Sequence, residues 1–135
     1  MTDTERIARR LIDRTLPKSD WTHEAHLCAG LWHVLHYGPA AALDLLRERI
    51  SAYNVSVGTL NTDTSGYHET ITRFYVVIID RFLCGEDRGA DLDELAGRLI
   101  AAHGDRRLPL RHYSEPRLFS VVARHSWVEP DLRPI

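Results

Sequence analysis

The sequence predicts an all-α fold, a single compact helical bundle of five to six helices with an irregular C-terminal tail wrapped over it. Apolar residues recur at helical spacing in several separate stretches, and no stretch alternates with the period of a half-buried strand. Capping residues, glycines and prolines divide these stretches from one another. A length of 135 residues suits one hydrophobic core, so residues 1–135 are expected to form a single helical domain.

The first helix is expected to begin after Thr2 and to end near Thr15. Thr2 and Glu5 have the spacing of a capping box, in which the hydroxyl satisfies a free N–H of the first turn. Pro17 cannot continue the helix, because it lacks an N–H and its ring is rigid.

A helical hairpin is expected next. Thr22 can cap a helix that runs to Tyr37. Gly38 then supplies a C-terminal stop, and Pro39 suits the first position of the following helix. That helix fades near Tyr53.

The second half of the chain carries similar signals, with a less regular end. The expected elements are a polar loop over 54–66, a helix from about 67 to 83 that Gly85 ends, a helix from Asp91 to Gly104, and one or two short helices over 108–113 and 116–127. Pro130 and Pro134 prevent a regular helix in the last residues. The tail is therefore expected to lie over the bundle.

Composition narrows the class of partner. Apolar residues make up 44% of the chain and charged residues 27%, with a formal net charge of -2. This charge attracts neither nucleic acid nor an anionic membrane, and no stretch reaches the roughly 20 apolar residues of a membrane span. Cys28 and Cys84 lie in apolar helical patterns, so we expect buried free thiols in a reducing cytoplasm. The sequence thus predicts a cytoplasmic protein that acts on a small molecule.

Three short motifs place histidine, carboxylate and phenol groups at the edges of apolar stretches. The motifs are Thr22-His23-Glu24-Ala25-His26-Leu27, Tyr67-His68-Glu69-Thr70 and Arg111-His112-Tyr113-Ser114. Helices from distant parts of a chain can build one polar pocket in this way, because each helix start can aim a side chain at a common centre. The functional site is expected there.

His23 and His26 are three residues apart, so they are neighbours on the first turn of their helix and could bind one metal ion together. The alternative is a histidine pair that bonds to loop backbone or faces solvent. The two readings are about equally favoured, because an isolated H-x-x-H is a weak signal. His33 and His36 are expected on the partly solvated side of the hairpin.

His68 shares a helical arc with the apolar residues Ile71, Tyr75, Ile78 and Phe82, so its ring is expected to point inward. A buried neutral imidazole suits a metal ligand or a general base. A hydrogen-bonded core histidine is the more ordinary alternative.

Two further residues could complete the site. Glu69 could act as a second ligand or proton acceptor, although an exposed ion pair with Arg73 one turn later explains it more simply. Tyr113 could donate a hydrogen bond in the pocket or pack its ring under the tail. The arginines of the tail could pin it to the bundle or hold a substrate carboxylate, and pinning is favoured.

The motifs in combination resemble a family of short bacterial proteins usually described as uncharacterised. They are T-H-x-x-H-L at 22–27, Y-H-E-T-x-T at 67–72, Y-S-x-x-x-L-x-S at 113–120 and A-R-x-x-W-V-E-P-D-L-x-P at 123–134. This resemblance implies one small helical domain and brings no established activity. The chain is also loosely similar to metal-binding bundles of the DinB type, but their downstream H-x-x-x-H is missing, so only the architecture is implied.

Two classes of function follow. The first is a small-molecule metabolic or biosynthetic enzyme. In it, His23, His26 and His68 hold a divalent metal such as Zn or Fe for a hydrolase or lyase reaction, with Glu69 or a bound water as the base. In a metal-free form, His68 acts as the acid and base on the substrate of an isomerase or cyclase reaction, and Tyr113 acts as a donor. The second is a non-catalytic module that binds a small ligand or forms a homodimer.

Overall fold

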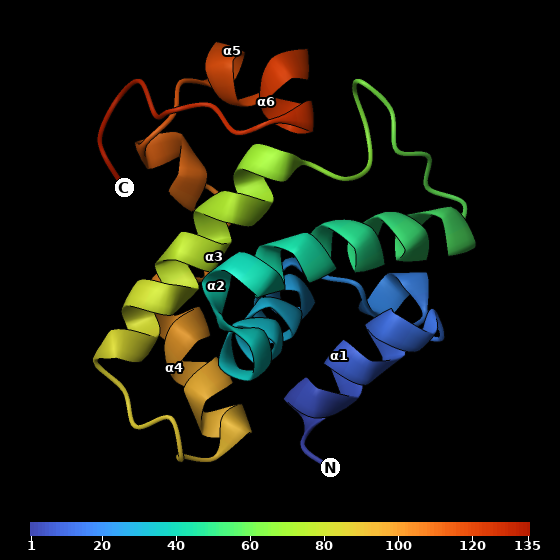
Figure 1. Ribbon diagram of the computed structural model, residues 1–135, viewed down its shortest axis with the longest axis vertical. Coiled ribbons are helices and arrows are strands. Elements are labelled where there is room, and N and C mark those ends of the chain that lie inside the picture. Colours follow the sequence, from blue (N-terminus) through green and yellow to red (C-terminus); the bar gives the residue numbers. More distant parts are fainter.

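The computed structural model describes all residues 1–135 and contains helices but no strands, as the sequence predicts (Figure 1). The α-helices are α1 (Asp3–Asp13), α2 (His23–Ser56), α3 (Glu69–Cys84), α4 (Leu92–His103), α5 (Glu115–Leu118) and α6 (Val121–His125). Two short 3-10 helices, η1 (Lys18–Asp20) and η2 (Leu108–Arg111), lie in the connections. No helix has the length and apolar character required to cross a membrane.

The residues that were expected to begin helices act as N-caps in the structure. The hydroxyl of Thr2 accepts a hydrogen bond from the Glu5 N–H at 3.1 Å and begins α1. Asp91 caps α4 in the same way by accepting from the N–H of Glu94. These caps satisfy N–H groups that have no partner inside the helix.

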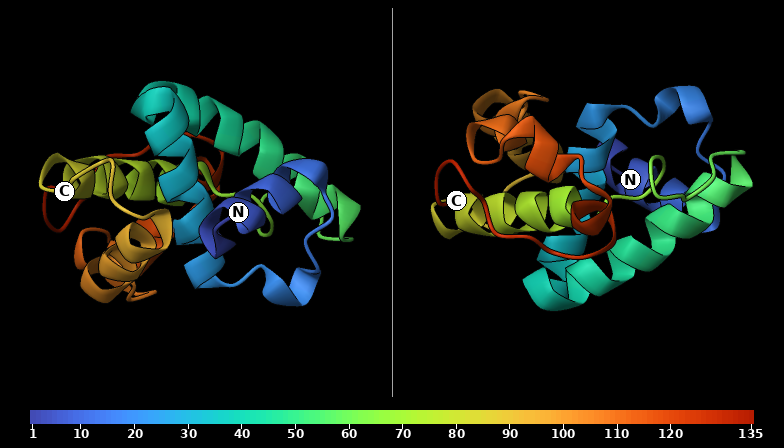
Figure 2. Two further views of the ribbon diagram at one scale, coloured as in Figure 1. Left: turned by 90° about the horizontal axis from the view of Figure 1, so that it is seen from below. Right: turned by 90° about the horizontal axis from the view of Figure 1, so that it is seen from above.

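Helix α2 is a hairpin of two limbs. Gly38 has φ 77° and ψ 166°, a conformation far from helical, and Pro39 begins the second limb. This region of backbone space is accessible essentially only to glycine, which explains why the bend occurs there. Figure 2 shows the two limbs crossing the molecule in different directions. The predicted hairpin is confirmed.

Helix α2 contacts α1, α3 and α4, and its first limb lies in the core. Ala29 and Leu31 on this limb are fully buried. Gly30 allows α3 to approach closely, because a Cβ atom at this position would lie 2.8 Å from Cδ1 of Ile79. The first limb of α2 and α3 are therefore direct neighbours in the core.

The buried face of α3 differs from the predicted arc. Tyr75 and Ile78 are only partly buried. The buried apolar residues are Phe74, Val76, Ile79 and Leu83. The reason is that α3 packs on two sides. Ile79 and Leu83 belong to the core around α2, while Phe74 belongs to a second cluster under the C-terminal segment. A single helical arc cannot describe both contacts.

The C-terminal segment lies over one end of α3, as Figure 1 shows in orange and red. Arg117 Nε donates to the carbonyl oxygen of Glu129 at 2.6 Å, and Arg124 donates to that of Gly66 at 2.9 Å. Arg124 thus ties the C-terminal segment to the loop before α3, in agreement with the favoured interpretation, whereas Arg117 joins two parts of the segment itself. The predicted burial of both thiols was half right, because Cys28 is buried but Cys84 is exposed in the last turn of α3.

Candidate functional site

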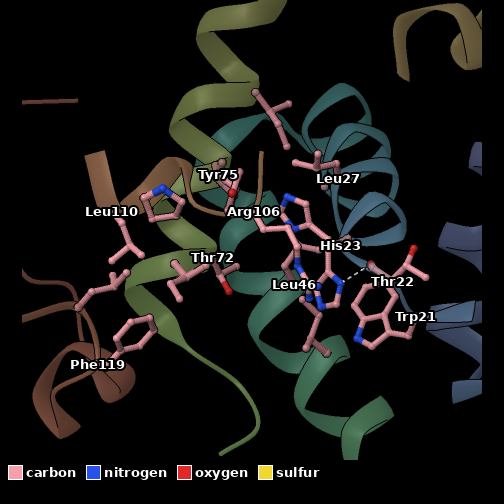
Figure 3. A pocket seen from close by; sticks show the side chains of 18 residues that line it. Trp21, Thr22, His23, Leu27, Leu46, Thr72, Tyr75, Arg106, Leu110 and Phe119 are labelled. Carbon is pink, nitrogen blue, oxygen red and sulfur yellow. Dashed lines mark hydrogen bonds between the residues drawn. The ribbon is translucent and has the colours of Figure 1, made fainter. Parts of the chain in front are cut away.

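A cavity of about 380 Å³ lies between the two limbs of α2, α3 and the segment that follows α4 (Figure 3). Eleven of its eighteen lining residues are hydrophobic. The residues that line it are Trp21, Thr22, His23, His26, Leu27, Gly30, Leu46, Ile50, Ile71, Thr72, Tyr75, Val76, Ile79, Arg106, Pro109, Leu110, Leu118 and Phe119. An apolar cavity with a few polar groups is the usual form of a small-molecule site.

The start of α2 supplies the histidines of this pocket. The hydroxyl of Thr22 accepts from the N–H of Ala25 at 3.2 Å, which fixes the first turn and places His23 and His26 on it. The indole of Trp21 stacks on the His26 ring with centroids 3.7 Å apart. Both predicted histidines therefore line one cavity, as the H-x-x-H spacing suggested.

His23 has a nitrogen that no protein group satisfies. Its Nε2 atom is buried and makes no hydrogen bond, one of only two such side-chain atoms in the protein. The ring meets the Tyr75 ring at a centroid distance of 5.4 Å in an edge-to-face arrangement. Desolvation, and then the positive charge of Arg106, lower the pKa of His23, so the imidazole is neutral near pH 7.

His26 is held by its own helix. Its Nδ1 lies 2.7 Å from the carbonyl oxygen of Thr22, and since that oxygen can only accept, Nδ1 carries the proton. Nε2 then keeps its lone pair. Desolvation by the surrounding groups lowers the pKa of His26, although part of the residue is in contact with solvent.

His68 lies elsewhere and serves as the N-cap of α3. Its Nδ1 accepts from the N–H of Ile71 at 3.1 Å, and its Nε2 lies 2.8 Å from the carbonyl oxygen of Leu118. Both nitrogens are therefore used by the backbone, and His68 does not line the cavity. The inward position was predicted correctly, but the geometry favours the core histidine over a ligand or a base.

Glu69 also has a structural partner. Its carboxylate accepts two hydrogen bonds from Arg47, at 2.9 and 2.7 Å, and one from the Tyr67 hydroxyl at 2.7 Å. Burial of Glu69 would raise its pKa, but the hydrogen bonds from Arg47 and Tyr67 outweigh this effect and lower it. The expected pair with Arg73 is wrong, because that guanidinium lies over the Trp127 ring at 4.5 Å.

Tyr113 packs under the tail rather than in the pocket. Its side chain is buried, and its hydroxyl donates to the carbonyl oxygen of Val128 at 2.7 Å. The ring meets Trp127 edge to face. This arrangement corrects the hypothesis that Tyr113 is a proton donor in the site and agrees with the packing alternative.

The expected metal ligands are not assembled. No group of three or more His, Cys, Asp or Glu side chains is arranged to hold one ion. His23 and His26 remain as a pair, while both nitrogens of His68 are bonded to backbone. Two imidazoles without a third protein ligand do not fit the usual zinc site, so no step is derived through a metal.

His33 was wrongly expected on the solvated side of the hairpin. It is fully buried, its Nδ1 lies 2.7 Å from the carbonyl oxygen of Ala29, and its Nε2 accepts from Arg49 at 2.9 Å. Desolvation is the main cause that lowers the pKa of His33 to about 4. The bend at Gly38 returns the second limb and its Arg49 to this ring, which a wheel of one helix cannot reveal.

Sequence reasoning missed two residues of the pocket. Trp21 directly precedes the cap of α2, and a stacking aromatic beside H-x-x-H could have been noticed there. Arg106 follows α4 in the tail, and nothing in its local pattern marks it. Thr72 and Tyr75 follow His68 in α3, yet they line the cavity that contains His23, whereas His68 does not.

No protein-family model, curated protein or solved structure matches this chain. The resemblance noted from the motifs therefore stays a prediction.

Proposed function

We propose that this protein binds a small, largely apolar molecule in the cavity between α2 and α3, and that His23 makes the hydrogen bond that orients it. The observation that carries this proposal is the His23 side chain, which lines the cavity and whose Nε2 atom is buried and without a hydrogen-bond partner. A buried polar atom is normally hydrogen-bonded, because leaving it unpaired costs about 1–3 kcal/mol. A ligand with a hydroxyl or carbonyl group would remove this cost.

The size and lining of the cavity support the same class of ligand. At the ~30 Å³ that one water takes in the liquid, about 380 Å³ holds on the order of a dozen non-hydrogen atoms. Leu27, Leu46 and Ile50 line it from the two limbs of α2, and Val76 and Ile79 line it from α3. An apolar body would pack against these side chains while one polar group faced His23.

Isothermal titration with 3-phenylpropan-1-ol tests binding. We expect saturable binding to the wild-type protein with a Kd of about 1 mM or tighter, as is common for a ligand of this size. Leu110→Trp fills the cavity from η2 and should weaken binding at least roughly tenfold. Leu45→Trp is the matched control, because Leu45 is also half-buried but lies outside the cavity. Binding unchanged by Leu110→Trp would contradict the proposal.

A second candidate, an acid/base enzyme, is favoured by the neutral state of the His23 imidazole. A neutral ring at the wall of an apolar pocket can take a proton from a carbon next to a carbonyl group and return one to it. In this reading the base is His23 and not His68, because His68 has no free nitrogen.

Hydrogen exchange distinguishes the enzyme from the binding module. In D2O, 4-phenylbutan-2-one should incorporate deuterium next to its carbonyl faster with wild-type protein than without it. His23→Gln should remove the acceleration. His36→Gln is the control, since His36 is exposed and does not line the cavity. No acceleration, or one that survives His23→Gln, would rule out this catalytic role.

A further inference from the structure

The charged residues that line the cavity indicate which charge a ligand should carry. Among the eighteen lining residues, Arg106 is the only Lys, Arg, Asp or Glu. His23 and His26 are both neutral near pH 7, because desolvation lowers their pKa values. The cavity thus has an apolar interior and one formal positive charge at its wall.

Arg106 has no carboxylate partner within the protein. Its neighbours in the chain are paired, since Arg107 lies 3.9 Å from Glu115 and Arg111 lies 3.0 Å from Asp105. Arg106 itself makes neither an ion pair nor a hydrogen bond, although Asp105 directly precedes it. The carboxylate of Asp105 is occupied by Arg111 and by the N–H of Arg107.

The Arg106 guanidinium acts on the same groups that a ligand would contact. Arg106 lines the same cavity as His23 and His26, and after desolvation its charge is a further cause that lowers the pKa values of both rings. Figure 3 shows Arg106, His23 and Tyr75 grouped in one part of the pocket. The two carboxylates that act on His23, Glu24 and Asp105, do not line the cavity.

From this arrangement we infer that the ligand is a monocarboxylate with an apolar body, whose carboxylate pairs with Arg106 while one of its oxygens meets Nε2 of His23. A guanidinium presents two parallel N–H groups that match the two oxygens of a carboxylate. One negative charge balances the one positive charge that Arg106 contributes, whereas a phosphate dianion would bring a second negative charge that no other lining side chain balances. The start of α2 adds the positive end of a helix dipole.

This inference rests on the proposed function and names its ligand class. The test compares 3-phenylpropanoate with 3-phenylpropan-1-ol, which share the same apolar body, by isothermal titration. The wild-type protein should bind the carboxylate at least roughly tenfold more tightly, as expected for a charge-assisted pair. Arg106→Gln should remove this preference, because it should weaken binding of the carboxylate much more than binding of the alcohol. Arg107→Gln, a change at an exposed neighbour outside the cavity, should keep the preference.

The outcomes separate the two proposals. Equal affinity for the two probes in the wild-type protein, or a preference that survives Arg106→Gln, overturns the carboxylate inference and leaves the proposed function standing. Failure of both probes to bind overturns both. Because Arg106 is exposed and makes no hydrogen bond or ion pair, the circular dichroism and thermal midpoint of Arg106→Gln should match the wild type.

Discussion

Nε2 of His68 lies 2.8 Å from the carbonyl oxygen of Leu118 and joins the start of α3 to α5. The donor is Nε2, because a carbonyl oxygen can only accept and Nδ1 accepts from the N–H of Ile71. The ring therefore caps one helix and anchors another with its two nitrogens. The motif Tyr67-His68-Glu69-Thr70 is explained by this architecture, together with the pairing of Glu69 with Arg47.

Replacing His68 should affect stability more than binding. We expect His68→Ala to lower the free energy of unfolding by about 1–3 kcal/mol, because the cap and the bond to Leu118 are both lost. His68→Asn should recover part of this loss, since asparagine is a good N-cap. Urea unfolding measures both variants. A His68→Ala protein of unchanged stability that no longer binds 3-phenylpropan-1-ol would instead make His68 part of the site.

The buried ring of His33 should make stability depend on pH. Its pKa is about 4 in the folded protein, mainly because of desolvation, against 6.5 ordinarily. Above pH 6.5 the ring is neutral in both states. Between 6.5 and about 4 only the unfolded chain takes up a proton, so the free energy of unfolding falls as the pH falls, by on the order of 3 kcal/mol from this residue.

Urea unfolding across this pH range tests the contribution of His33. His33→Gln should flatten the dependence, whereas His36→Gln, at an exposed position, should keep the wild-type slope. The remaining slope in His33→Gln would come from the other histidines whose pKa values are lowered, such as His68. An identical slope in His33→Gln and wild type would contradict the assignment.

The bend of α2 should depend on its glycine. Gly38→Ala places a side chain at φ 77° and ψ 166°, and we expect a loss of about 1–3 kcal/mol from backbone strain. Gly97→Ala is the opposite case, because Gly97 lies in α4 with open space around its Cβ position. That change should stabilise the protein by about 0.5–1 kcal/mol. Thermal unfolding of the two variants should therefore give shifts of opposite sign.

Two adjacent isoleucines of α3 should differ in their importance. Ile79 is 1% exposed within the main core, so Ile79→Ala should cost about 2–5 kcal/mol. Ile78 is half-buried at the edge of the second cluster, and Ile78→Ala should cost less. Equal losses by urea unfolding would mean that the face predicted from the helical wheel is as important as the observed one.

The fold could be predicted largely because its signals are local. Thr2, Thr22 and Asp91 cap the helices that they were expected to cap, and Gly38 bends the chain where only glycine can. The predicted start of the fourth helix near Tyr67 was two residues early. This small error matters for function, since it hid the N-cap role of His68, which occupies a ring nitrogen that a base would need.

The site could be predicted only in part, because it depends on contacts between distant segments. His23 and His26 were found from their spacing within one turn. Arg106 reaches the same cavity from the segment after α4, and Arg49 reaches His33 only through the bend at Gly38. Neither contact can be predicted from the spacing of apolar residues within one helix.

Nuclear magnetic resonance of the histidine rings during titration with 3-phenylpropan-1-ol tests the central claim most directly. In the proposed complex the free nitrogen of His23 meets the ligand, while both nitrogens of His68 are bonded to backbone. We expect a saturable shift of the His23 Nε2 resonance and no comparable shift at His68. A shift at His68 with none at His23 would contradict the proposal.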